Sequence, residues 1–467
     1  MTSTAHGSAS EPRAGSRARL RRVVSSPWAW AVVLIAISVS WGIRLQRETP
    51  EIFLGAAPLV GRDPRHGWSW RFSWALVAAA AVGAMVVFAT WRGWWWRWRT
   101  RTIVPTVALG AAVFAVLLAL TDGRDGLLHG AVDPTEYLAN LAIMPPVGEF
   151  VRNFVEDIDR YSVHVRGHPP GFVVLLAVMD AIGLDGGWPV VGLSVAGTAL
   201  TPAGVLVAAW AVGGVEWVRR CAPVMIVAPY ALWMMTSADA VFAAVGAWGV
   251  ATCVLGLRST GRRALAWGTT SGLLLGGLLF FTYGGATFVV VPLVPTIVAL
   301  RRRQPGAVPT VVGAVVAAGL VTAGFAAAGF WWFAGATETR LQYWAGTAQF
   351  RPFAYFALAN LAATLIAIGP AGFGGLLRLW QQRRRPPAIA VLVLGGFLAL
   401  MASHLSQYSR AEVERIWLLF FPWLVLAGGL LIDRPDAGAA VRRLAAITLS
   451  VQVVLAVVLQ AALVSKW

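Results

Sequence analysis

Two acids, Asp133 and Glu136, lie shortly after a long apolar run, in the segment 133–138 (Asp-Pro-Thr-Glu-Tyr-Leu). A carboxylate beside lipid is partly desolvated, and desolvation raises its pKa toward the range in which it can act as a general base. The same residues also fit a structural role, because Asp followed by Pro is a favoured start of a helix. The segment by itself leaves both interpretations open.

A histidine precedes two consecutive prolines in the segment 166–171 (Arg-Gly-His-Pro-Pro-Gly). The prolines fix the backbone angle φ and lack N–H donors, so they make a rigid start to the apolar helix that follows. Rigid placement would hold His168 at the membrane surface, where it could bind a phosphate or a sugar hydroxyl. A purely structural turn is the alternative.

Charged side chains at the ends of later apolar runs form two further groups. Asp239 follows Thr-Ser-Ala between two hydrophobic runs, where an acid is costly and suggests a function, although a helix N-cap explains it as well. The second group combines arginines, which suit bidentate contact with phosphate, with acids that could simply pair with them. It consists of Arg340, Tyr343, Arg351, Arg410, Glu412, Glu414 and Arg415.

The common motifs of soluble enzymes are absent from the sequence. It contains no glycine-rich phosphate loop, zinc signature or nucleophile elbow. Its two cysteines, Cys221 and Cys253, offer neither a disulfide framework nor a metal-binding spacing. Acids, one rigidly held histidine and arginines beside apolar segments instead fit a lipid-phosphate substrate, whose head group reacts while its tail stays in the membrane.

Membrane helices must position these residues. The chain of 467 residues is 58% hydrophobic and 13% charged, whereas a soluble domain carries about 25% charged residues. A helix needs about 20 apolar residues to cross a bilayer, so we expect an all-α polytopic membrane protein with about 13 transmembrane helices. The predicted spans are 28–45, 72–91, 103–121, 189–213, 221–237, 239–257, 264–283, 286–300, 308–333, 353–377, 387–403, 416–432 and 442–464.

The arginine distribution predicts the orientation. The arginine clusters between apolar runs fall on one face, which the positive-inside rule assigns to the cytoplasm of a plasma-membrane protein. The net charge of +17 therefore reflects topology rather than nucleic-acid binding. This agreement requires that the short apolar segment 169–184 does not cross, so we expect an interfacial helix there.

The predicted organisation follows from these spans. Residues 1–25 form a disordered cytoplasmic tail, and residues 26–467 form one transmembrane helical domain. The segment 122–188 is the main extracytoplasmic loop, polar and rich in acids, with short interfacial helices. The candidate site therefore faces the extracytoplasmic side.

The order of these features resembles the GT-C superfamily of membrane glycosyltransferases. Its members typically have an acidic first outer loop, a His-Pro-Pro or Lys-Pro-Pro element, a glycine-containing turn, a long helix ending in arginines and a later outer acid. The matching features here are 122–168, 168–170, 183–187, 219–220 and Asp239. The segments 166–171 and 411–417 look like those of uncharacterised actinobacterial membrane proteins of GT-C type.

The resemblance implies transfer of a sugar from a polyprenyl-phosphate donor to an extracytoplasmic lipid or cell-envelope glycan, with inversion. A first-loop acid is the catalytic base in the superfamily, which points here to Asp133 or Glu136. Two extra helices precede the loop, so Asp122 and Asp125 are alternatives. Some members use a divalent cation, so a metal is optional, and we expect no other cofactor. The implied substrate-binding residues are His168, Asp239, Tyr343, Arg351, Arg410 and Arg415.

A transporter or flippase for a lipid-linked or anionic substrate is the alternative function. Such a protein should carry ionisable residues in mid-span or paired broken helices. Asp180 is the main ionisable residue inside an apolar run, and that run is expected to be interfacial.

We predict opposite labelling of cysteines introduced at His164 and Arg302. A membrane-impermeant thiol reagent added to intact cells should label H164C, and it should label R302C only after the membrane is permeabilised, because the arginine bias places position 302 inside. The reversed pattern would overturn an extracytoplasmic site.

Overall fold

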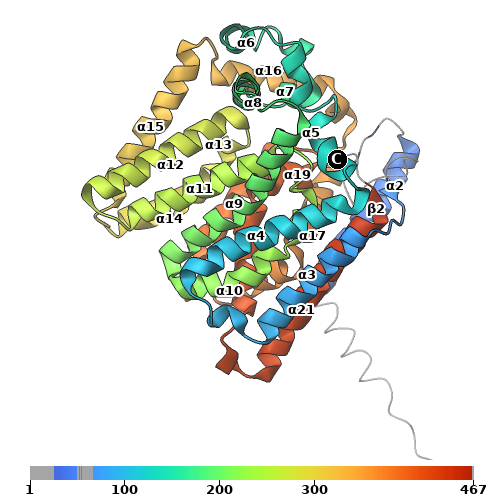
Figure 1. Ribbon diagram of the computed structural model, residues 1–467, viewed down its shortest axis with the longest axis vertical. Helices are drawn as coiled ribbons and strands as arrows, with labels where there is room; N and C mark the ends of the chain where they lie inside the picture. The colour runs from blue at the N-terminus through green and yellow to red at the C-terminus, as the bar shows by residue number, and fades with distance from the viewer. Residues whose placement is uncertain (1–25, 50–51, 53, 55–66, 465–467) are drawn as a thin grey trace, which may run out of the picture.

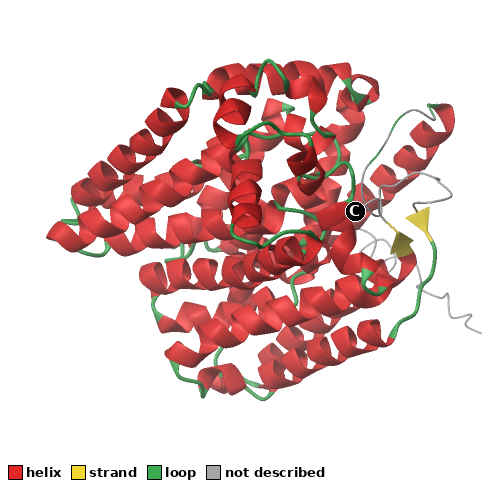
Figure 2. Ribbon diagram, turned by 45° about the horizontal axis from the view of Figure 1, so that its top comes forward, coloured by secondary structure: helices red, strands yellow, loops and turns green. Residues whose placement is uncertain are grey.

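The computed structural model describes residues 26–49, 52, 54 and 67–464, and the predicted tail 1–25 lies outside these residues. The described part is almost wholly helical, as Figures 1 and 2 show. Its only strands are the two-residue β1 (Gly67–Trp68) and β2 (Leu463–Val464), which pair antiparallel. The predicted all-α membrane fold is confirmed.

Nine helices in the described residues are long and apolar enough to cross a bilayer. These are α2 (Pro27–Glu48), α3 (Trp74–Trp91), α4 (Thr100–Ala119), α9 (Gly187–Gly213), α11 (Asp239–Leu257), α12 (Gly261–Phe281), α15 (Ala307–Ala327), α17 (Phe353–Gln381) and α21 (Ala439–Ala462).

Shorter α-helices connect or cap them. These are α5 (Asp125–Val132), α6 (Val147–Asn153), α7 (Val163–Arg166), α8 (Gly171–Ala181), α10 (Val215–Ile226), α13 (Gly285–Phe288), α14 (Val290–Arg301), α16 (Trp332–Ala345), α18 (Ala390–Ser406), α19 (Val413–Ile416) and α20 (Phe421–Val425). The 3₁₀ turns are η1 (Trp94–Trp96), η2 (Leu120–Asp122), η3 (Leu138–Ala142), η4 (Ile158–Arg160), η5 (Pro229–Trp233), η6 (Thr347–Phe350), η7 (Trp417–Leu419), η8 (Leu426–Leu431) and η9 (Pro435–Ala437).

The count of 13 spans is not confirmed. The predicted span 416–432 consists of two helical pieces bent by 75°, which gives up to ten candidate spans in the described residues. The predicted span 221–237 is interrupted, because α10 ends at Ile226 and η5 begins at Pro229. The segments 285–301 and 390–406 are apolar helices shorter than the nine. Helix α8 has 11 residues, about half of what a bilayer requires, in keeping with the predicted short helix at 169–184.

Glycines allow the central helices to approach closely. A Cβ atom on Gly197 of α9 would lie 2.6 Å from the backbone of Ala240 in α11, and one on Gly268 of α12 would lie 2.2 Å from the carbonyl oxygen of Thr310 in α15. Small residues at such crossings provide the backbone contact that holds helices together in lipid, where there is no hydrophobic drive. Helices α9 and α11 consequently form much of the buried centre.

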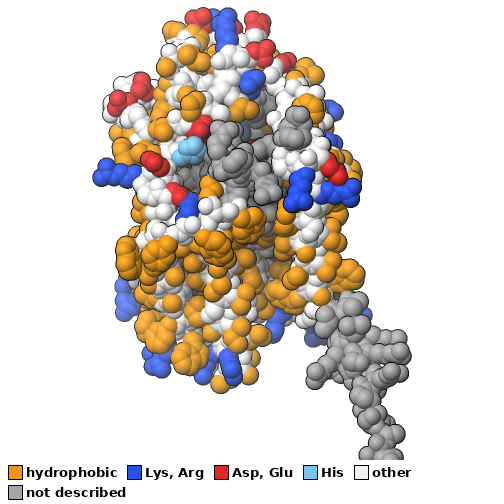
Figure 3. Space-filling view, turned by 90° about the vertical axis from the view of Figure 1, so that its right-hand side faces the viewer, with side chains coloured by type: hydrophobic (Ala, Val, Ile, Leu, Met, Phe, Trp, Pro, Cys, Tyr) orange, Lys and Arg blue, Asp and Glu red, His pale blue; other side chains and the backbone are white. Residues whose placement is uncertain are grey.

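The two ends of the bundle differ in charge. Helices α5, α6, α7, α8 and α16 gather at the top of Figure 1 and form a cap, whose end we call the acidic end. In Figure 3 a band of hydrophobic side chains separates an upper part, which carries both acidic and Lys or Arg side chains, from a lower end whose visible charged side chains are Lys and Arg. At the lower end, which we call the arginine end, Arg219 donates to the carbonyl of Trp98 and Arg220 pairs with Asp433.

A buried glutamine supplies hydrogen-bond partners to the backbone at two breaks between helical segments. Gly369 has φ of 67° inside α17 and Pro370 follows it, so the helix is interrupted there. Gln452 of α21 is fully buried; its Oε1 accepts from the N–H of Ala371 at 3.0 Å, and its Nε2 donates to the carbonyl of Val227 at 3.1 Å. Lipid offers no replacement partner for these backbone groups.

We predict that Gln452→Leu destabilises the protein by about 2–3 kcal/mol, because two buried backbone groups lose their partner. The check is the thermal unfolding midpoint in detergent. Gln460→Leu is the matched control, because it makes the same substitution in the same helix. The side chain of Gln460 makes no hydrogen bond to a described residue. Equal midpoints for the two variants would contradict this role.

Candidate active site

The guanidinium of Arg415 is the centre of a buried ionic cluster below the cap. Its Nη1 lies 3.4 Å from Glu136 Oε1, its Nε 3.9 Å from Asp239 Oδ2, and its Nη2 3.4 Å from Glu412 Oε2. Nη2 also donates to Nε2 of His164 at 3.0 Å. Only 4% of the Arg415 side chain is exposed. We call these five residues the Arg415 cluster.

A strained turn directs Arg415 inward. Ala411 and Glu412 have φ angles of 72° and 61°, a region that non-glycine residues rarely adopt, and α19 begins directly after them. Beyond α19, the indole of Trp417 donates to Ser403 Oγ at 3.0 Å and so ties this segment to α18. Strain of this kind persists where the surrounding contacts require it, often at functional sites.

Glu136 is held in the cluster by a hydrogen-bonded loop. Asn140 Nδ2 and Ser162 Oγ both donate to the backbone carbonyl of Glu136, at 2.9 and 3.0 Å, and Ser162 N donates to Asn140 Oδ1 at 2.8 Å. This network joins the turn at 136 to the start of α7. It therefore brings Glu136 beside His164.

Glu136 and His164 form a close acid–imidazole pair. His164 Nδ1 lies 2.8 Å from Glu136 Oε1, a contact without hydrogen-bond alignment. Because His164 Nε2 accepts from Arg415, the proton of the neutral ring belongs on Nδ1, facing the carboxylate. Glu136 is 3% exposed, and its second oxygen, Oε2, is buried without a hydrogen-bond partner among the described residues. A buried carboxylate oxygen in that state is suited to accept a hydrogen bond from a bound substrate.

Asp239 contributes a second carboxylate from the first turn of α11. The hydroxyl of Ser237 donates to Asp239 Oδ2, the same oxygen that lies near Arg415. Asp239 is thus buried at the first residue of a candidate span with a cation nearby, which offsets the cost of its burial. Asp239 and Arg415, both candidate substrate-binding residues from the sequence, are thus brought to 3.9 Å of each other.

Glu412 links the cluster to a second arginine. Burial alone would raise the pKa of Glu412, but the nearby guanidinium groups of Arg351 and Arg415 outweigh it and lower the pKa to about 2. Arg351 Nη2 donates to Glu412 Oε1 at 2.9 Å. Glu412 is therefore ionised throughout the physiological pH range.

Arg351 and Arg410 join the loop that follows η6 to the loop that follows α18. Arg351 Nη1 donates to the carbonyl of Arg410 at 2.6 Å, and Arg410 Nη1 donates to the carbonyl of Arg351 at 2.8 Å. Tyr343 Oη accepts from the N–H of Arg410 at 2.8 Å, and the Arg410 guanidinium lies 4.6 Å from the ring centre of Trp344. The three predicted residues Tyr343, Arg351 and Arg410 thus form one unit beside the Arg415 cluster.

His168 lies in an aromatic setting next to the cluster. Its ring lies 5.5 Å from that of Tyr137 and 5.8 Å from that of Phe242. Burial lowers the pKa of His168 to about 4, so the ring is neutral near pH 7. Its Nδ1 lies 2.8 Å from the carbonyl oxygen of His164, which makes Nδ1 the protonated nitrogen. His168 can therefore meet a ligand as a neutral group and supports the backbone at His164.

Asp133 lies apart from the Arg415 cluster. Its Oδ1 accepts from the N–H and hydroxyl of Thr135, and its Oδ2 lies 3.7 Å from His129. Asp122 is likewise elsewhere, paired with Arg71. Of the acids considered as base, Glu136 alone joins the cluster in the described residues.

Sequence reasoning gave no role to His164. A usable signal exists, because His164 and His168 are four residues apart and would share a face of one helical turn. This spacing was overlooked because the two prolines after His168 distinguish that residue alone. The positioning residues Asn140 and Ser162 carry no comparable signal.

The Arg415 cluster with Arg351 carries unequal charge. Glu136, Asp239 and Glu412 supply three carboxylates, whereas Arg351 and Arg415 supply two cations. The excess of acceptors favours a ligand that brings hydrogen-bond donors, such as hydroxyl groups, to this point. An anionic group is better placed beside Arg410, whose guanidinium has no carboxylate partner among the described residues.

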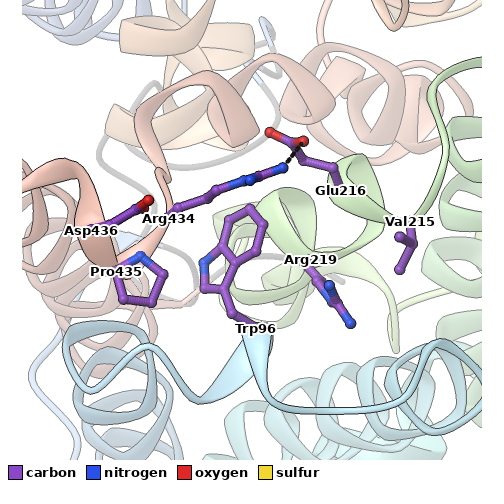
Figure 4. A pocket seen from close by; sticks show the side chains of 7 residues that line it. All are labelled: Trp96, Val215, Glu216, Arg219, Arg434, Pro435 and Asp436. Carbon is purple, nitrogen blue, oxygen red and sulfur yellow. Dashed lines mark hydrogen bonds and ion pairs between the residues drawn. The ribbon is translucent and has the colours of Figure 1, made fainter.

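A cavity of about 470 Å³ lies at the arginine end, away from this cluster. Figure 4 shows Trp96 between Arg434, which is bonded to Glu216, and Arg219. None of the predicted site residues lines it. Its lining contains two acids and two arginines, whose charges cancel, so we assign it no role in the site.

No group of three or more His, Cys, Asp or Glu side chains in the described residues is arranged to hold a metal ion. The optional divalent cation therefore stays a prediction.

Comparisons with known proteins give little close similarity. No protein-family model matches the sequence, and no curated protein matches it. Among solved structures, the chain is similar to an Archaeoglobus fulgidus oligosaccharyltransferase crystallised with zinc and sulfate, with a TM-score of 0.49 and 14% sequence identity. The match covers 77% of this chain and 54% of that one, so the chain spans about half the length of the archaeal protein.

We predict that Arg415→Met destabilises the protein by about 3–5 kcal/mol, because it leaves buried carboxylates without their cation. Arg160→Met is the control: its ion pair with Asp157 is mostly exposed on the arginine side, and its loss should cost under about 1 kcal/mol. Thermal unfolding midpoints in detergent provide the measurement. If Arg415→Met proves as stable as the control, the cluster does not hold the cap in place.

Proposed function

We propose that the chain is a membrane glycosyltransferase of GT-C type that transfers a hexose or pentose from a polyprenyl-phosphate donor to an acceptor hydroxyl. The observation that carries this proposal is the buried carboxylate of Glu136, with one oxygen unpartnered in the described residues and a histidine and an arginine at the other. The resemblance of segments 166–171 and 411–417 to GT-C proteins supports the same class. The acceptor is a lipid or cell-envelope glycan on the extracytoplasmic side.

Glu136 is the proposed base. Its Oε2 takes the proton of the acceptor hydroxyl as the hydroxyl oxygen forms a bond to the anomeric carbon of the sugar. The bond from that carbon to the phosphate oxygen breaks on the opposite face, and the lipid phosphate leaves with the electron pair. The configuration is inverted. Burial between Arg415 and His164 fixes the carboxylate in position. Holding the base in the reactive geometry raises the rate of the reaction.

Arg410 is the proposed contact for the leaving phosphate. Its guanidinium makes no ion pair with a carboxylate of the described residues, and its Nη2 makes no hydrogen bond with them. Stacking on Trp344 holds the planar group in place. Arg351 is occupied by Glu412 and by the Arg410 carbonyl, so we assign it, with Tyr343, to positioning Arg410.

The remaining predicted residues take supporting roles. Asp239 shares the charge of Arg415 with Glu136 and adds an acceptor for sugar hydroxyls. His168, neutral near pH 7, orients His164 through its backbone carbonyl. In this proposal the acidic end faces the extracytoplasmic side of the plasma membrane, and the N-terminus is cytoplasmic.

We predict that purified protein consumes a donor from a panel of polyprenyl-phosphate sugars when lipid or glycan acceptors are supplied. Glu136→Gln should lower transfer by at least about 100-fold, the usual scale for losing a general base. Asp133→Asn, an equal change on the same loop but outside the cluster, should lower it by less than about threefold. Product formation is followed by mass spectrometry.

Unfolding midpoints of the two variants separate lost chemistry from lost folding. Transfer that survives Glu136→Gln would remove the base assignment. Donor that crosses a proteoliposome membrane without being consumed would instead favour a transporter.

A further inference from the structure

Four aromatic side chains project from the extended segment that leads from β1 into α3. Trp68, Trp70, Phe72 and Trp74 are 54%, 76%, 73% and 79% exposed. Side chains at every second position of an extended chain share one side, and the rings of Phe72 and Trp74 lie with their centres 5.9 Å apart. We call these four residues the aromatic ribbon.

The opposite side of this segment is fixed to the protein. Ser69 N donates to the carbonyl of Ala462 at 2.8 Å, and Arg71 N donates to that of Ala461 at 2.7 Å. The side chain of Arg71 pairs with Asp122 and donates to two carbonyls at the end of α21. Rigid attachment on one side leaves the aromatic side facing outward as a stable surface.

The anchoring contacts place the aromatic ribbon at one level of the bundle. Trp74 begins α3, Asp122 ends η2 just beyond α4, and the accepting carbonyls of residues 460–463 lie at the end of α21 and the start of β2. Figure 1 shows β2 at the upper end of α21, below the cap. The ribbon therefore lies where three candidate spans end at the acidic end.

The ribbon continues the lipid-facing surface of these helices. Met85 of α3 is 59% exposed and Val454 of α21 is 58% exposed, as are other apolar residues along the same two helices. An apolar helix surface of this kind is covered by lipid tails. Where this apolar surface of α3 and α21 ends, the surroundings change from lipid tails to the head-group region of the bilayer.

We infer that the aromatic ribbon inserts among the phospholipid head groups at the acidic end of the bundle and sets the depth of the protein in the membrane. Tryptophan is suited to that region, since its ring is apolar and its N–H finds polar partners there. Four large rings exposed to water would instead form an apolar patch of the kind soluble surfaces avoid. This inference does not depend on the proposed function.

The test uses a fluorescent label at the centre of the ribbon. In full-length protein with the buried Cys221 and Cys253 replaced by alanine, Trp70→Cys carries an environment-sensitive dye in phospholipid nanodiscs. Lipids with a nitroxide near the head group should quench the dye roughly twofold more than lipids with a nitroxide near the chain end, since the ribbon belongs at the interface. Aqueous iodide should quench it weakly.

Arg160→Cys is the matched control, because Arg160 is exposed in η4, within the polar segment 122–188, and is not at the end of a candidate span. Its dye should respond to iodide and not to either nitroxide lipid. Equal behaviour at positions 70 and 160 would overturn the inference. Protection from iodide at position 70 without nitroxide quenching would also overturn it, by indicating that protein or glycan covers the ribbon. Stronger quenching from the chain end would place the ribbon too deep.

Discussion

A guanidinium buried away from water stays compatible with folding only if carboxylates surround it. Arg415 meets this condition with acids that come from three distant parts of the chain, at positions 136, 239 and 412. None of these segments can shift alone without leaving a buried charge unpaired. The cap above the bundle is consequently tied to α11 and α19 through one side chain, and the geometry of the candidate site follows from that constraint.

The same constraint explains why several apolar segments are broken. Bringing Arg415 inward requires a short helix after a strained turn, and the chain then bends by 75° between the two pieces of the 413–431 segment. Broken helices leave backbone groups that lipid cannot satisfy. The fully buried Gln452 meets this need for α17 and for the end of α10. A buried polar side chain thus stabilises the broken helices of the bundle.

Apolar length predicted the long helices well, because bilayer thickness sets it and each residue contributes independently. It could not predict the breaks at 226–229 or within 413–431, because hydropathy does not register where the backbone leaves a helix. The cost of an acid in lipid drew attention to Asp239, and the structure brings its carboxylate to 3.9 Å from Arg415. The pairing of Arg415 with Glu136 could not be predicted from the sequence, because it joins positions far apart in the chain. Residue type also could not tell that Arg351 is already bonded to Glu412, whereas Arg410 lacks an acid partner in the described residues.

The aromatic ribbon and the candidate site are connected through Asp122. Arg71, on the inner side of the ribbon segment, pairs with Asp122, and only α5 separates that acid from the turn that carries Glu136. If the ribbon lies among the head groups, as we infer, the Arg415 cluster would lie near the same level. A substrate with a lipid phosphate keeps its phosphate at that same level, because its tail cannot leave the hydrocarbon. The depth of the protein in the membrane would then bring the reacting bond to Glu136, since the bilayer itself orients the donor.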